Sequence, residues 1–112
     1  MMSILGIGLD AEIRANLASL NTFDDEVVYL DKLDDAGPLF SSEDVSLVLV
    51  DSHASDHLRE DMNHLLGETS LTTRIILITH PSDMLSTETY AALGITTLDS
   101  PVTAEKLEEA IN

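Results

Sequence analysis

The stretch VSLVLVDSH, residues 45–53, is the most informative part of this 112-residue chain for its fold. Its first six residues are apolar except for Ser46, and the run stops at Asp51. A strand buried on both faces has this composition, and such strands belong to parallel sheets that helices cover on both sides. The stretch RIILIT at 74–79 has the same character. The two runs predict the centre of a parallel sheet, with Asp51 at its carboxyl edge.

Five apolar runs along the chain predict strands, and helical patterns lie between them. The expected strands are Ile4–Leu9, Glu26–Leu30, Val45–Val50, Arg74–Thr79 and Ile95–Leu98. Apolar residues at helical spacing predict helices over 10–20, 55–66, 82–94 and 103–111. Residues 34–44 contain Gly37 and Pro38, which predict a short or irregular crossover.

Capping residues set the expected helix ends. Asp10 is a suitable N-cap for the first helix, and Gly67 and Gly94 are suitable ends for the third and fourth. The alternation predicts one α/β domain over 1–112: a doubly wound, five-stranded parallel sheet of the (βα)5 flavodoxin-like class, with strand order 2-1-3-4-5.

The chain is strongly acidic. It has 21 Asp and Glu against 5 Lys and Arg, a formal net charge of −16. Such a surface repels phosphate backbones, so we expect no direct binding of nucleic acid. The acids are spread along the chain and lysine is rare, which favours a high-salt cytoplasm, as in a halophilic archaeon, over an acidic mesophilic domain. With no cysteine, no signal peptide and no membrane-length apolar run, we expect a cytoplasmic protein without membrane contact.

In a doubly wound sheet, functional groups gather where strands 1, 3, 4 and 5 end. The residues expected there are Gly8, Leu9 and Asp10; Asp51; Thr79 and His80; and Asp99, Ser100 and Pro101. VSLVLVD, RIILIT and ALGITTLDSPVTAEKLEEAI, in this order, resemble the receiver (CheY-like) domains of two-component response regulators. The resemblance covers essentially the whole chain and implies a role in signal transduction.

The resemblance also implies roles for single residues. Asp51 falls on the phospho-acceptor of the family, and Thr79 falls on the hydroxyl residue that contacts the phosphoryl group. Pro101 falls on a proline that follows a cis peptide bond.

Other positions depart from the family pattern. Gly8 and Leu9 stand where the family has two adjacent acids that hold Mg²⁺, which leaves only Asp10 nearby. Ser100 replaces a lysine, and His80 replaces a small residue. Phosphoryl transfer to a carboxylate depends on charge neutralisation by Mg²⁺ and a cation. The sequence therefore predicts a degenerate receiver, or pseudo-receiver, with no cofactor and only weak binding of Mg²⁺.

The histidines permit a second kind of site. If residues 53–66 formed one helix, His53, His57, Asp61 and His64 would lie on one stripe, and paired histidines can bind Zn²⁺. A solvated polar edge is the preferred interpretation, because the stripe borders solvent and a loop is expected before Ser55.

The predicted function is a non-enzymatic signalling and protein-interaction module that works without phosphorylation. It would be the input domain of a transcription regulator or a stand-alone adaptor. Two alternatives stay open: a functional phospho-acceptor at Asp51, and a sensor of a small molecule or metal in the crevice at the strand ends.

The expected contact surface is the last third of the chain. Residues 82–103 contain only three acids, and the family uses the face of helix 4, strand 5 and helix 5 for dimers and output contacts. Leu85 and Tyr90 are the interface candidates, for a protein partner or a homodimer.

Overall fold

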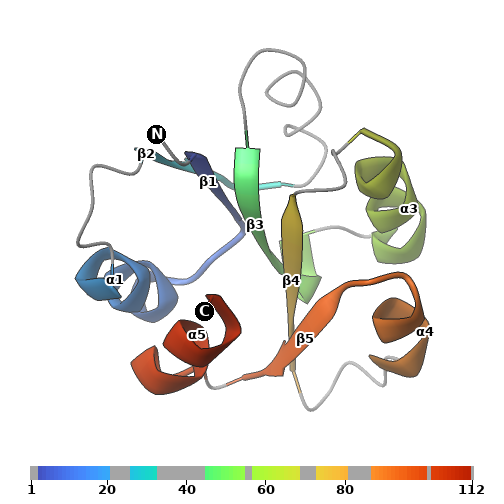
Figure 1. Ribbon diagram of the computed structural model, residues 1–112. Helices are drawn as coiled ribbons and strands as arrows, with labels where there is room; N and C mark the ends of the chain where they lie inside the picture. The colour runs from blue at the N-terminus through green and yellow to red at the C-terminus, as the bar shows by residue number, and fades with distance from the viewer. Residues whose placement is uncertain are drawn as a thin grey trace.

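The computed structural model describes residues 3–20, 26–32, 45–54, 57–68, 73–80, 87–100 and 102–111. Figure 1 shows strands and helices that alternate along the chain, except between the second and third strands, where no helix is described. The elements are β1 (Ser3–Ile7), α1 (Ala11–Leu20), β2 (Glu26–Leu30), β3 (Val45–Asp51), the 3₁₀ turn η2 (Ser52–Ala54), α3 (Leu58–Glu68), β4 (Arg74–Thr79), α4 (Thr87–Ala92), β5 (Thr96–Asp99) and α5 (Ala104–Ile111). The crossover expected over 34–44 lies outside the described residues, as do Leu85 and Pro101.

The five strands form one parallel sheet in the order β2-β1-β3-β4-β5. The predicted fold class and strand order are therefore confirmed. Strand β1 ends two residues earlier than expected, at Ile7, and β5 begins and ends one residue later. Strand β3 includes Asp51 as its last residue, and this residue pairs with Ile78 of β4. The aspartate thus sits at the carboxyl end of the central strand.

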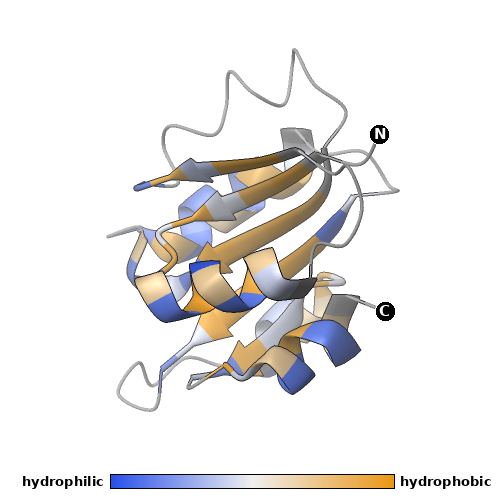
Figure 2. Ribbon diagram, turned by 90° about the vertical axis from the view of Figure 1, so that its left-hand side faces the viewer, coloured by the Kyte–Doolittle hydropathy of each residue, from blue (hydrophilic) through white to orange (hydrophobic). Residues whose placement is uncertain are grey.

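Successive residues of the central strands face opposite layers of helices. Val48 and Val50 pack with Met62 and Leu65 of α3 in one buried cluster. The intervening residues of these strands pack in a second cluster with α1 and α5, which includes Leu47, Leu49, Ile76, Ile78, Ile13, Leu17 and Leu107. Figure 1 shows α1 and α5 on one side of the sheet, with α3 and α4 on the other, and Figure 2 shows apolar strands between them. This two-sided burial explains the continuous apolar runs.

Helix ends follow the capping chemistry at two of three expected positions. Asp10 Oδ1 accepts a hydrogen bond of 2.8 Å from the backbone N–H of Ile13, so Asp10 is the N-cap of α1. Gly94 follows α4 with a φ of 86°. Gly67 does not end α3, which continues to Glu68, so that expectation was wrong.

The end of α4 also corrects the assignment of Tyr90. The backbone N–H of Ile95 donates to the carbonyl of Tyr90, and that of Gly94 donates to Ala91, both at 3.0 Å. This is a Schellman motif, in which the residues equivalent to Tyr90 and Ile95 often make an apolar contact. Both are buried in the same cluster, Tyr90 with 5% of its surface exposed. Tyr90 is a core residue and is unsuited to the surface role expected of it.

Within the described part of the chain, no helix combines the length and hydrophobicity that a bilayer crossing requires.

Candidate functional site

Asp51 is a buried carboxylate held at the end of β3. Only 5% of the residue is exposed. Its Oδ1 accepts a hydrogen bond of 2.8 Å from the backbone N–H of His53, two residues further along in η2. This is the side-chain-to-backbone contact by which aspartate forms a local turn. The contact restricts the orientation of the carboxylate.

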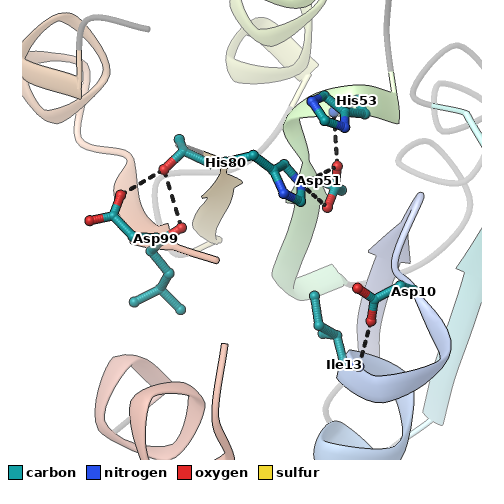
Figure 3. A network of polar contacts seen from close by, with 8 residues as sticks. Asp10, Ile13, Asp51, His53, His80 and Asp99 are labelled. Carbon is teal, nitrogen blue, oxygen red and sulfur yellow. Dashed lines mark hydrogen bonds and ion pairs between the residues drawn. The ribbon is translucent and has the colours of Figure 1, made fainter. Parts of the chain in front are cut away.

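His80 covers the same carboxylate from the neighbouring strand. It follows Thr79, the last residue of β4, and its Nε2 lies 2.9 Å from Oδ2 and 3.1 Å from Oδ1 of Asp51. The ring of His53 stacks on the ring of His80, with centroids 4.3 Å apart and an interplanar angle of 13°. Figure 3 shows both imidazoles beside Asp51. Both carboxylate oxygens of Asp51 therefore contact one imidazole nitrogen.

The sequence placed His80 at the strand ends but did not predict this contact with Asp51. A neutral imidazole with its proton on Nε2 donates a hydrogen bond to the carboxylate, and a protonated one forms an ion pair with it. From the sequence, only lysine and arginine were considered as cations, and His80 was interpreted as a bulky replacement. The signal was present, because β3 and β4 were expected to be neighbours and His80 directly follows β4.

Thr79 contacts β5, which lies on the side of β4 opposite to β3. Its hydroxyl donates to Asp99 Oδ1 at 2.9 Å, and the carbonyl oxygen of Leu98 lies 3.4 Å from the hydroxyl oxygen. The backbone N–H of Ser100 donates to the carbonyl of Thr79 at 2.7 Å. The hydroxyl is thus engaged with β5, and Figure 3 shows Asp99 well separated from Asp51.

The end of β1 does not fit a magnesium site. Gly8 has a φ of 67°, and a Cβ built on it would lie 2.6 Å from the Cβ of Ala54 in η2. Leu9 is buried in the cluster with Ile13. Asp10 is exposed, and its carboxylate caps α1, as Figure 3 shows. Mg²⁺ needs an octahedral set of oxygen ligands, and this turn offers it neither a side chain nor room for one at residue 8.

The comparisons with known proteins bear on the fold. No protein-family model and no curated protein sequence matches the chain. Among solved structures, a response regulator receiver domain protein from Clostridium thermocellum has a TM-score of 0.78 at 22% identity, covering 100% of this chain and 92% of that one. The chain has the receiver fold.

Two further solved structures share this fold and come from proteins of other kinds. A putative CpaE2 pilus assembly protein from Sinorhizobium meliloti 1021 has a TM-score of 0.76 at 18% identity, covering 97% of this chain and 96% of that one. The signal receiver domain of a modulated diguanylate cyclase from Desulfovibrio desulfuricans G20 has a TM-score of 0.72 at 21% identity, covering 97% and 89%. At these identities the likeness concerns the fold alone.

Within this receiver fold, the structure brings together only some of the residues expected at the site. Asp51 meets His80 and His53, whereas Asp10 caps a helix and Thr79 binds β5. The single helix over 53–66 on which a histidine stripe would depend does not form, because His53 belongs to η2 and α3 begins only at Leu58.

Proposed function

We propose that this chain is a signalling and protein-interaction module on a receiver fold, and that it works without phosphorylation of Asp51. The observation that carries the proposal is the contact of His80 Nε2 with both carboxylate oxygens of Asp51, at 2.9 and 3.1 Å. A phosphoryl group bonds to one of these oxygens, so a donor has to displace the imidazole first. The buried position of Asp51 adds to this obstacle.

Two further features support the proposal. The turn after β1 has Gly8 and Leu9 where Mg²⁺ ligands would be needed, so negative charge on an incoming phosphoryl group is not neutralised there. The hydroxyl of Thr79 is bonded to Asp99, on the side of β5. Three of the groups that would position a phosphoryl group are thus replaced or engaged elsewhere.

The proposed contact surface lies on α4 and the turn that follows it. Leu93 is 44% exposed, and it is a large apolar side chain at the end of α4. On this helix Thr89, Ala91 and Ala92 are exposed and uncharged, and Glu88 is the single acid. The exposed face of α5 is acidic instead, with Glu105, Glu108 and Glu109. Uncharged surface on a very acidic protein is where association meets least repulsion. We place the centre of a homodimer or partner contact at Leu93, with control of transcription as the proposed output.

Acetyl phosphate with Mg²⁺ is expected to leave the protein unmodified. The reason is that His80 covers the acceptor oxygens and that Gly8 and Leu9 supply no carboxylate for Mg²⁺. Intact-protein mass spectrometry measures the outcome, with a phosphorylatable receiver domain treated in parallel as the positive control. A stoichiometric phosphoryl adduct that disappears in Asp51→Asn would establish the phospho-acceptor alternative instead.

Leu93→Glu is expected to weaken self-association by at least roughly tenfold, as truncation or charging of a central contact residue does. The fold should survive, because the side chain is exposed and lies outside both buried clusters. Sedimentation equilibrium in molar KCl measures the dissociation constant under conditions that screen the general repulsion. Asn63→Glu adds the same charge to an exposed position on α3 and is the matched control. If both variants associate like the wild type, the surface is misplaced.

A further inference from the structure

Three potential metal ligands converge from separate points of the chain. Asp51 ends β3, His53 lies in η2 and His80 follows β4. One ligand atom from each side chain lies within 4.8 Å of those from the other two. Figure 3 shows the two rings and the carboxylate gathered on one side of the strand ends.

The spacing is close to what a small cation requires. Two ligand atoms that each lie 2.0–2.1 Å from a tetrahedral ion are about 3.3 Å apart. His80 Nε2 lies 2.9 and 3.1 Å from the Asp51 oxygens, so a separation of a few tenths of an ångström admits an ion between them. The backbone N–H of His53 holds Oδ1 and orients the carboxylate, the role that outer-sphere hydrogen bonds have in metal sites.

The chemistry of the three ligand side chains indicates which metal ions the site would favour. Two imidazoles and one carboxylate suit Zn²⁺ and other divalent transition metals, whereas Mg²⁺ prefers oxygen ligands only. Three protein ligands leave a fourth position for water or another ligand. We propose that Asp51, His53 and His80 form a binding site for a divalent transition-metal ion, with Zn²⁺ as the ion that suits it best.

The site needs one rearrangement. Stacked rings present their nitrogens side by side, so the ring of His53 has to tilt toward Asp51 to complete the ligand set. His53 is exposed, which leaves space for this rotation. The net charge of −16 raises the local concentration of any cation. The site uses imidazoles outside the family's magnesium ligands, and its test does not involve phosphorylation of Asp51.

Zn²⁺ titration against a chromophoric chelator tests the proposal. In molar KCl, which screens loose binding to the acidic surface, the wild type is expected to take up one equivalent. His53→Ala is the cleanest variant because the side chain is exposed, and it should weaken binding by at least roughly tenfold, as loss of even an outer-sphere partner does. His80→Ala and Asp51→Asn should do the same. The double variant His57→Ala with His64→Ala is the matched control and should bind like the wild type; His57 lies just before α3 and His64 lies on it.

Two outcomes would overturn the site. One is weak uptake without a defined stoichiometry, which would leave His80 as a polar contact of Asp51 only. The other is a defined site that survives His53→Ala or is lost in the His57/His64 control. NMR of the imidazole nitrogens gives a separate readout, since Zn²⁺ must shift the signals of His53 and His80. Both outcomes are independent of labelling by acetyl phosphate, so this proposal and the proposed function fail separately.

Discussion

Changing Gly8 and Leu9 together to aspartate is expected to unfold most of the protein rather than create a magnesium site. An aspartate at residue 8 would combine a φ of 67° with a Cβ that lies 2.6 Å from the Cβ of Ala54. An aspartate at residue 9 would replace a buried leucine by a carboxylate within the cluster formed with α1. Loss of a buried leucine costs about 2–5 kcal/mol, and burial of a charge adds to it, against a total stability of about 5–15 kcal/mol.

Urea unfolding followed by circular dichroism measures this effect, again in molar KCl. Ala11→Asp with Ala15→Asp is the matched control, because it adds the same charge at exposed positions of α1. The control should stay within about 1 kcal/mol of the wild type. A double variant at residues 8 and 9 that unfolds at the wild-type urea concentration would show that the turn after β1 rearranges freely, and it would contradict the close packing of Gly8 against Ala54.

Tyr90→Glu is expected to lower the free energy of unfolding by more than about 3 kcal/mol, the usual cost of removing a buried aromatic ring, because a carboxylate also becomes buried. Tyr90 is 5% exposed and packs in the cluster that α3 shares with the sheet. Urea unfolding provides the measurement.

Leu93→Glu is the control for Tyr90→Glu, since it adds the same charge three residues further along, at a position that is 44% exposed. An exposed substitution of this kind changes stability by about 0.5 kcal/mol or less. Equal destabilisation of the two variants would contradict the burial of Tyr90, and so would a stable Tyr90→Glu that fails only to associate.

The fold could be predicted because its strongest signals are local. The runs VSLVLV and RIILIT are apolar at nearly every position, and only a sheet covered on both faces buries them fully. Asp10 marks the start of α1 and Gly94 follows the end of α4, both as expected, because an N-cap and a left-handed C′ residue depend on a few backbone groups nearby. Gly67 was a misleading signal, since glycine inside a helix costs only about 1 kcal/mol and packing of the helix can outweigh it.

The site could be predicted only in part, because its contacts join residues that are distant in sequence. The strand order placed β3 beside β4, but the contact of His80 with Asp51 also depends on side-chain rotamers. The position of His53 depended on where the helix begins, and helix boundaries are poorly determined by sequence. The burial of Tyr90 had an available signal: it lies four residues before Gly94, the place where a Schellman motif brings an apolar residue against the one after the glycine.

The adjacency of Thr79 and His80 has a mechanical consequence. One residue binds Asp99 on β5 and the next binds Asp51 on β3, so two contacts on opposite sides of β4 share a single peptide unit. The two contacts are therefore linked through the backbone of β4. A backbone rotation that moves His80 away from the Asp51 carboxylate also changes the orientation of the Thr79 hydroxyl. Two adjacent residues of the chain, Thr79 and His80, therefore connect β5, at the edge of the sheet, with β3, at its centre.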